Sequence, residues 1–421
     1  MRPLDNSIES ALLKIVLNEN LCQAFEFLRD QTEQLVSRLS EEDQCVQSMP
    51  DASPIKWHLG HTTWFFESVV LLAHCAGYEK FSESFSYLFN SYYESLGPRQ
   101  PRPQRGLITR PSLSEVMAYR AHVTRAMALW LAQSNLNNDV LDLIVLGIHH
   151  EQQHQELMVT DALHLFSCHP FLPDSRLLFS FDSAPHALDT RPHWIQFESG
   201  LYEFGQALEE KSEFAFDNEQ PRHKRWLNAF EMSDQLVTQG EFLTFILDGG
   251  YQNPSWWLSE GWSWVSQTQT SAPTYWFSPN SPRNSSQEWQ VFGVNGLREL
   301  NLNEPVSHLN FFEAEAFSQW SGARLPTEFE WELAFGHPKI NQMQGSVWQW
   351  TRSSYEPYPG FQANSGAIRE YNGKFMVGQQ VLRGSSWATP AGHARKTYRN
   401  FFPPAAQWQI TGLRLARDCK Q

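Results

Sequence analysis

The 421-residue chain has few cysteines and no paired-cysteine motif. Five cysteines are scattered along the sequence without a Cys-X-X-Cys spacing. An odd and sparse set of this kind argues against a disulfide framework and against a zinc cluster built on thiolates. We therefore look for chemistry on other side chains. The five residues are Cys22, Cys45, Cys75, Cys168 and Cys419.

Long apolar runs and runs of basic residues are also missing. No apolar stretch approaches the roughly 18 residues that a membrane-spanning helix needs. The amino-terminal residues 1–20 lack the apolar core and the cleavage site of a signal peptide. The formal net charge is −14, and no cluster of Lys and Arg indicates a nucleic-acid surface. We therefore expect a cytoplasmic, soluble protein that binds neither membranes nor nucleic acids.

What is present indicates two domains. A chain of 421 residues is long for one hydrophobic core. Residues 6–39 have apolar residues spaced three and four apart, and three more long helices are expected to begin near Ser53, Ser112 and Asn137. Ser112 and Glu115 have the spacing of a capping box. Four long helices that follow one another predict an up-and-down bundle.

The pattern changes between residues 170 and 192, where prolines replace the helical period. The remainder is rich in Gly, Pro, Asn, Ser and Trp, which is typical of an α+β domain with much irregular structure. Two helices are expected in it, one that ends at Gly322 and one within residues 327–336. We therefore predict an all-α domain over residues 1–185 and an α+β domain over residues 186–421.

One otherwise apolar helix carries three histidines and two glutamates within residues 148–156, IHHEQQHQE. His150 and His154 lie four residues apart, so a helix places both on one face, as it would two metal ligands. Glu156 lies about 200° around the axis from His154. We therefore do not expect Glu156 to share a coordination shell with the two histidines. Imidazole ligands suit Zn, Fe, Cu and Ni, so the ligand type alone does not choose the metal.

A second helix supplies another pair of histidines. The stretch WHLGH contains His58 and His61, which lie three apart and so on one side of the helix. Ligands from facing helices of a bundle project into its core. Either residue could therefore complete a three-imidazole site with His150 and His154. The alternative is a polar stripe that faces solvent, but two histidine pairs on apolar helices favour the metal site.

A long connection, residues 78–111, follows the second helix and is rich in Tyr, Arg and Pro. Connections of this length in compact domains are often functional. A tyrosine beside an open metal site can donate a proton or a hydrogen atom, and arginines match a carboxylate with their planar fork. The alternative is a tyrosine pair packed beneath a solvated basic loop. The residues concerned are Tyr92, Tyr93, Arg99, Arg102, Arg105 and Arg110.

Several motifs in the second half of the chain follow one another in a characteristic order. They are FAFDNEQPRH, VTQGEFLTFI, PVSHLNFFEAEAFSQWSGARLPTEFEWELA, GSVWQWT and the set LRGSSW, TYRNFFP and TGLRLARD. Together they resemble the formylglycine-generating-enzyme-like domain, a loop-rich relative of the C-type lectin fold, over residues 193–418. The active-site cysteine pair of formylglycine-generating enzymes has no counterpart in residues 384–400. Thiol-based copper chemistry is therefore excluded.

The helices resemble the DinB-like four-helix bundle, with SPIKWHLGH and HHEQQHQE as its metal motifs. A DinB-like bundle followed by this second domain resembles the nonheme-iron sulfoxide synthases of ergothioneine biosynthesis over almost the whole chain. The resemblance implies an oxidoreductase that uses Fe(II) and O₂ to form a C–S bond between hercynine and cysteine or γ-glutamylcysteine. It implies iron ligands at His61, His150 and His154, and it leaves His58 as a neighbouring or packing residue.

The resemblance also implies residues that bind the small-molecule substrates. Gln153, Asn400 and Phe401 would contact hercynine, whose trimethylammonium group an aromatic face can hold. A tyrosine of the long connection, Tyr93 slightly favoured over Tyr92, would donate a proton or a hydrogen atom. The carboxylate of the sulfur donor would be bound by Arg99, Arg102 and Arg105.

Other functions stay open at this point. A selenoneine synthase would use the same scaffold and iron site but take a selenosugar as the donor. A metal-dependent thiol transferase of the DinB type would bind Zn and work without oxygen. A lectin-like binding module would tolerate the loss of all three proposed histidine ligands.

Overall fold

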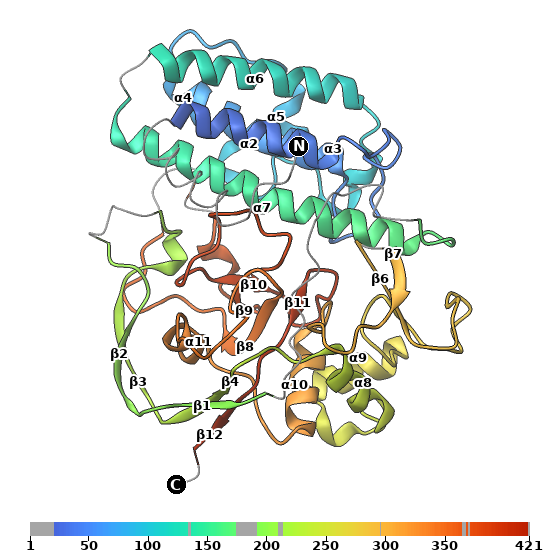
Figure 1. The fold of residues 1–421 in the computed structure, drawn as a ribbon. Coiled ribbons are helices and arrows are strands. Elements are labelled where there is room, and N and C mark those ends of the chain that lie inside the picture. The colour runs from blue at the N-terminus through green and yellow to red at the C-terminus, as the bar shows by residue number, and fades with distance from the viewer. Residues whose placement is uncertain are drawn as a thin grey trace.

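The computed structural model describes residues 21–133, 136–173, 192–208, 214–294, 296–363, 368 and 371–419. A layer of long helices lies on a second layer of short strands and short helices (Figure 1). The predicted order of an all-α bundle followed by an α+β domain is confirmed. The boundary expected at residue 185 lies outside the described residues. In the part of the chain that is described, no helix is both long and apolar enough to cross a membrane.

Within the described residues, four long helical segments form the bundle. The second segment begins as α3, continues through a π-helical turn and ends as α4. The segments α2 and α3 both pack against α6 and α7. The long connection between the second and third segments carries three short helices. The bundle elements are α2 Leu21–Val36, α3 Ile55–Phe65, η1 Phe66–Leu71, α4 Leu72–His74, α5 Glu83–Phe89, η2 Glu94–Leu96, η3 Arg102–Leu107, α6 Leu113–Gln133 and α7 Asn138–Cys168.

The ends of these helices follow from local sequence. The Asn137 side chain accepts a hydrogen bond from the Val140 amide at the start of α7. The capping box predicted before α6 is confirmed, because Ser112 and Glu115 each bond the other's backbone amide. Residues 6–39 were expected to form one helix, of which the part after residue 20 is described and forms α2.

Helix α3 passes very close to the last residue of α5, Phe89. A Cβ atom on Gly60 would lie 2.3 Å from the ring of Phe89, so only glycine allows this approach. The approach brings the carbonyl oxygen of Phe89 within 2.6 Å of His61 Nδ1. The packing of α5 on α3 therefore controls the orientation of a candidate metal ligand.

The second layer contains several small sheets rather than one large sheet. The sheets have the strand orders β1-β4-β12, β10-β9-β8-β11, β2-β3 and β5-β6-β7. The two helices predicted here are confirmed as α10, which Gly322 follows with φ +71°, and α11. The elements are β1 Trp194–Phe197, β2 Gly200–Phe204, η5 Asp217–Glu219, β3 His223–Leu227, β4 Phe230–Ser233, α8 Gln239–Leu247, η6 Pro254–Trp256, α9 Ser259–Thr268, β5 Trp276–Phe277, β6 Gln290–Gly293, β7 Gly296–Glu299, α10 Phe311–Trp320, α11 Glu328–Ala334, β8 Trp348–Ser354, η8 Gly373–Phe375, β9 Gln380–Gly384, β10 Asn400–Phe402, β11 Thr411–Gly412 and β12 Ala416–Asp418.

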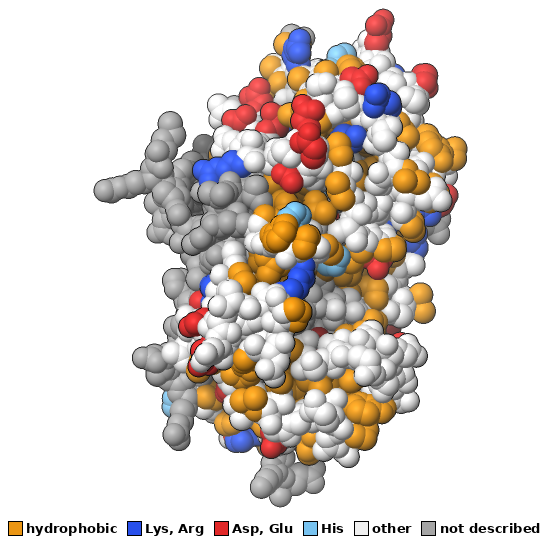
Figure 2. Space-filling model, turned by 90° about the vertical axis from the view of Figure 1, so that its right-hand side faces the viewer, with side chains coloured by type: hydrophobic (Ala, Val, Ile, Leu, Met, Phe, Trp, Pro, Cys, Tyr) orange, Lys and Arg blue, Asp and Glu red, His pale blue; other side chains and the backbone are white. Residues whose placement is uncertain are grey.

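The two layers share a large hydrophobic core, and a smaller cluster of buried apolar residues lies within the second layer. A single cluster of buried apolar residues runs from Phe25 in α2 to Trp348 in β8 and Leu413 beyond β11. On the face seen in Figure 2, acidic side chains gather mainly over the helical layer, and uncharged side chains cover most of the lower layer. The helix α7 lies along the junction between the layers (Figure 1). Side chains on opposite sides of α7 therefore face different domains.

Candidate metal centre

Three buried histidines meet inside the bundle, one from α3 and two from α7. His61, His150 and His154 each present a ring nitrogen, and these nitrogens all lie within 4.8 Å of one another. The three rings pack at centroid distances of 4.9, 4.8 and 4.6 Å. The structure thus brings together the three histidines that were predicted to be metal ligands.

Burial and mutual proximity keep these imidazoles neutral. Burial lowers the pKa of His154 well below its usual value, and the neighbouring His150 and His61 lower it further. The pKa of His61 falls well below its usual value for the same two reasons, burial first and then His150. Burial lowers the pKa of His150 to about 3. A neutral imidazole has a free lone pair, which is the form that binds a metal ion.

The hydrogen bonds of the three histidines fit a metal ion. His61 Nδ1 donates to the carbonyl oxygen of Phe89 at 2.6 Å, which leaves the lone pair on Nε2. That Nε2 atom and both ring nitrogens of His150 are buried and have no hydrogen-bond partner among the described residues. Leaving buried polar nitrogens unpaired costs free energy. A metal ion bound to His61 Nε2 and to one ring nitrogen of His150 would remove part of this cost.

His58, expected near the site but not in it, is hydrogen-bonded to one of the ligands. Its Nδ1 atom lies 2.8 Å from Nδ1 of His154. Its Nε2 atom lies 3.1 Å from Asp161 Oδ2. His58 is therefore turned away from the other two histidines of the site and towards the end of α7.

A column of stacked planar groups holds the His61 ring. Trp57 stacks on His61 with a centroid distance of 4.6 Å and an interplanar angle of 13°, and Trp64 stacks at 5.6 Å and 16°. The guanidinium carbon of Arg105 lies 3.3 Å above the centroid of Trp57. Burial lowers the pKa of Arg105 to about 8, with the charges of Arg102 and Arg99 adding to the effect. The cation–π contact compensates part of the cost of this burial.

A cavity of about 330 Å³ lies between the bundle and the second domain, beside His150 and His154. Its volume falls in the range of small-molecule sites. Of the predicted site residues, the cavity is lined by Tyr92, Arg99, Arg102, Arg105, His150, Gln153, His154 and Asn400. The structure does not place the predicted metal ligand His61, the predicted proton donor Tyr93 or the predicted substrate contact Phe401 on its wall.

The two neighbouring tyrosines have different surroundings. Their rings stack at 4.7 Å, but Tyr92 is half-buried at the cavity while Tyr93 is fully buried behind it. Tyr93 packs against Trp64 and Phe65. Phe401 is likewise turned away from the cavity and stacks on a ring of the second domain, Tyr355, at 4.1 Å.

The three predicted arginines converge on one end of the cavity. Arg99 donates to Glu94 and to the carbonyl oxygen of Ser91. Arg102 bonds a backbone carbonyl oxygen, and Arg105 donates to a serine hydroxyl at 2.9 Å. Neither Arg102 nor Arg105 has a carboxylate partner within the described residues. This end of the cavity therefore carries positive charge that an anionic ligand could balance.

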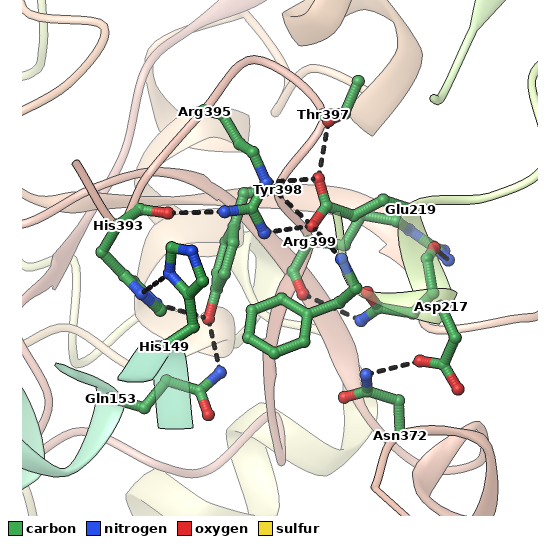
Figure 3. A network of polar contacts seen from close by, with 12 residues as sticks. His149, Gln153, Asp217, Glu219, Asn372, His393, Arg395, Thr397, Tyr398 and Arg399 are labelled. Atoms are coloured by element: carbon green, nitrogen blue, oxygen red, sulfur yellow. Dashed lines mark hydrogen bonds and ion pairs between the residues drawn. The ribbon is translucent and has the colours of Figure 1, made fainter. Parts of the chain in front are cut away.

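Gln153 points into a network that joins α7 to the second domain (Figure 3). Its Nε2 atom donates to the hydroxyl of Tyr398 at 2.8 Å, and the hydroxyl of Tyr371 donates to its Oε1 atom. His393 lies 3.2 Å from the same Tyr398 hydroxyl. The amide of Gln153 is thus held in one orientation at the cavity wall.

The segment that carries Tyr398 is itself anchored. Glu219 accepts a hydrogen bond from Thr397 at 2.6 Å and pairs with Arg395 (Figure 3). Sequence reasoning missed Tyr371, Tyr398 and His393. Tyr398 lies two residues before Asn400 in TYRNFFP and could have been found there, whereas Tyr371 stands in a stretch without any motif.

Glu156, the last residue of the histidine motif, is turned away from the imidazoles and faces the second domain. It accepts hydrogen bonds from Trp348 Nε1 at 2.8 Å, from Ser386 Oγ at 2.5 Å and from Thr389 Oγ1 at 2.7 Å. The helical phase predicted that Glu156 would not be a ligand. It did not predict the function that these contacts indicate, which is to join α7 to the second domain.

Comparisons with known proteins agree with this two-domain arrangement. Residues 24–158 match the DinB superfamily, and residues 181–339 and 337–419 match the sulfatase-modifying factor enzyme 1-like domain. The chain is 31% identical to the hercynine oxygenase of Mycolicibacterium thermoresistibile over 75% of its own length and 78% of that protein. It is 29% identical to the hercynine oxygenase of Mycolicibacterium smegmatis over 96% of its length and 100% of that protein. It is 23% identical to ergothioneine biosynthesis protein 1 of Schizosaccharomyces pombe, over 49% of its length and 28% of that protein.

Proposed function

The chain belongs to the hercynine oxygenase family, and on this premise we propose that it is a nonheme-iron sulfoxide synthase of ergothioneine biosynthesis. It would use O₂ to join hercynine to cysteine or γ-glutamylcysteine. The observation that carries the proposal is the buried histidine triad, two members of which line a cavity that also holds an arginine cluster. The metal and the two substrates would thus meet in one enclosed space.

His61, His150 and His154 would hold Fe(II) through neutral imidazoles. When bound, Fe(II) supplies redox chemistry with dioxygen and the coordination positions that three imidazoles leave open. The protein side chains supply the positioning of two small molecules around one centre, which converts a reaction between separate molecules into one within a complex.

Hercynine would lie between α7 and the second domain. The oriented amide of Gln153 and the side chain of Asn400 offer hydrogen bonds on one wall of the cavity. Aromatic rings on the wall, among them Tyr92 and Phe402, offer faces for the trimethylammonium group. Because Phe401 stacks on Tyr355 while Phe402 lines the cavity, we assign the aromatic contact with this cation to Phe402.

The donor would bind at the arginine end of the cavity. Arg102 and Arg105 line the cavity together with Tyr92 and would give this space a positive charge. A donor with at least one carboxylate matches this charge, which favours cysteine or γ-glutamylcysteine over an uncharged selenosugar. Tyr92, which lines the cavity, would hold a proton for the reaction, and Tyr93, which stacks on its ring, would support it from behind.

A reconstitution experiment tests the proposal. The full chain would be loaded with Fe(II) without oxygen and then given O₂, hercynine and one donor at a time. We expect mass spectrometry to detect a hercynine–cysteine sulfoxide, with O₂ consumed in step. Product from a selenosugar alone would identify a selenoneine synthase, and oxygen-independent transfer with Zn would identify a thiol transferase. The same assay on Tyr92→Phe and Tyr93→Phe separates the two tyrosines.

The ligand assignment has its own test. We expect His154→Ala to abolish iron binding, because two imidazoles remain where three are needed to hold the ion. His74→Ala, at an exposed position on the same helical segment as His61, is the matched control and should bind iron normally. A His154→Ala chain with full iron content would disprove the assignment.

A further inference from the structure

A carboxylate lies behind one of the three candidate metal ligands, at the end of a chain of two imidazoles. Asp161 follows His154 by two helical turns on the same face of α7. The ring of His58 lies between them, with Nδ1 at 2.8 Å from His154 Nδ1 and Nε2 at 3.1 Å from Asp161 Oδ2. All three side chains are buried.

The carboxylate is tied down from three directions. Its Oδ2 atom accepts a hydrogen bond from the backbone amide of Ser53 at 2.8 Å as well as the one from His58. Its Oδ1 atom accepts a hydrogen bond from Trp408 Nε1 in the second domain at 3.1 Å. An ionised carboxylate can only accept hydrogen bonds. Asp161 therefore fixes the direction of every hydrogen bond that reaches it.

The hydrogen bond that Asp161 accepts also decides where the protons lie on His58 and on the candidate ligand His154. Because Asp161 accepts, His58 must have its proton on Nε2, which leaves a lone pair on Nδ1. His154 must then have its proton on Nδ1, so its own lone pair lies on Nε2. Nε2 of His154 is therefore the nitrogen that can bind a metal ion.

We propose that His58 and Asp161 are positioning residues that hold His154 in its metal-binding tautomer and ring orientation. The inference rests on the proposed metal centre at His61, His150 and His154. Partners behind a metal-binding histidine orient its ring and increase its basicity. The three candidate ligands differ in this respect, since His61 is backed by a backbone carbonyl and His150 by no hydrogen-bond partner among the described residues.

Metal titrations of the full chain test the proposal. Fe(II) is added without oxygen, and Co(II) is added separately as a spectroscopic probe. We expect His58→Leu and Asp161→Asn each to weaken metal binding by about 10- to 100-fold. We also expect both to shift the visible absorption bands of bound Co(II). Asp142→Asn, an exposed position on the same helix, is the matched control and should leave affinity and spectrum unchanged.

The asparagine variant is informative because it keeps the shape and changes the proton pattern. An amide has one accepting and one donating end, whereas Asp161 accepts from donors at both oxygens. If the donating end faces His58, the tautomers of His58 and His154 are both reversed. If it faces Trp408, two donors meet. Either arrangement weakens the hydrogen bonds that fix the tautomer and the ring orientation of His154.

Two further variants separate positioning from simple structural support. The double variant His58→Leu/Asp161→Asn should bind metal no more weakly than the single variant with the lower metal affinity. Both residues act on His154 through the same series of hydrogen bonds, so their losses should not add. His58→Gln, whose amide can accept from His154 and donate to Asp161, should bind metal more tightly than His58→Leu.

The opposite results overturn the inference. If His58→Leu and Asp161→Asn bind Fe(II) and Co(II) like the natural chain and only lower the melting temperature of the metal-free protein, the pair is structural. Additive losses of metal affinity in the double variant would also contradict the inference, because they would show that His58 and Asp161 act independently. If the natural chain binds neither ion, the proposed metal centre itself is wrong and the positioning role falls with it.

Discussion

Two glutamates on α7, Glu151 fully buried and Glu156 partly buried, are held in opposite ways. Glu151 and Glu156 lie five residues apart, turned by about 140° around the helix axis. Glu151 faces the bundle interior, where it pairs with Arg29 at 2.8 Å and Arg120 at 2.5 Å and accepts a hydrogen bond from Thr32 at 2.7 Å. Glu156 faces the second domain and meets only uncharged donors.

The pKa values of the two carboxyl groups differ accordingly. Burial alone would raise the pKa of Glu151, but the charges of Arg120 and Arg29 outweigh it and lower the pKa to about 2. Burial raises the pKa of Glu156, and its three hydrogen bonds only partly oppose the rise. In the bundle interior, the negative charge of Glu151 is thus balanced by Arg29 and Arg120. The junction between the domains holds the Glu156 carboxyl group by neutral hydrogen bonds, which compensate only part of the cost of its burial.

Breaking the charged site should have the largest effect. Glu151→Gln leaves the buried Arg29 without its carboxylate and leaves Arg120 with Glu33 alone, and we expect it to lower the free energy of unfolding by about 3–5 kcal/mol. Chemical denaturation followed by circular dichroism measures the change. Glu26→Gln, on the exposed side of α2, is the control and should change stability by less than about 0.5 kcal/mol. A loss no larger than the control's would show that the arginines are solvated after all.

A third buried glutamate sharpens the comparison by its dependence on pH. Glu313 on α10 is held by uncharged donors, Tyr251 at 2.5 Å and the Asn310 amide at 2.9 Å, and burial raises its pKa to about 7. Because this folded-state pKa lies above the unfolded value, its contribution to stability is fully present below about pH 4.5 and is lost as the pH rises to about 7.

The Glu313→Gln variant lacks this titration. Relative to the variant, the natural chain should therefore lose about 2–3 kcal/mol of stability between pH 5 and pH 8. Unfolding free energies of both chains at the two pH values give the difference. A natural chain whose stability changes with pH in parallel with that of the variant would contradict the raised pKa.

The uncharged site should respond least to loss of its charge. Glu156→Gln keeps an acceptor for the second domain, and we expect it to cost less than about 1 kcal/mol. Glu156→Ala leaves the donors Trp348, Ser386 and Thr389 without their acceptor and should cost about 1–3 kcal/mol. Denaturation under the conditions used for Glu151→Gln makes the comparison direct. Equal losses for the two glutamine variants would remove the distinction between the two faces of α7.

The helical half of the fold could be predicted because its signals are local. Apolar spacing, the capping box at Ser112 and the four-residue spacing of His150 and His154 are read within one or two turns. The π-helical turn at Phe66–Leu71 and the strands of two to seven residues could not be predicted this way. The strands are too short to show a period, and we attribute the turn to packing between helices.

The candidate site was predictable in part for the same reason. The helical phase placed His58 and His61 on one side of α3, and the local pattern could not choose between them. The structure separates them through long-range contacts, since His61 meets Phe89 and His58 meets Asp161. The partners of Gln153 lie more than 200 residues away along the chain, so no local pattern could have indicated them.

The helix α7 also restricts how this chain can change in evolution. It carries the candidate ligands on one side and the contacts to the second domain on the other, all between His149 and Asp161. One inserted or deleted residue in this stretch would turn everything after it by about 100°. Changes of length must therefore accumulate in the connections, while this stretch of α7 can change by substitution alone.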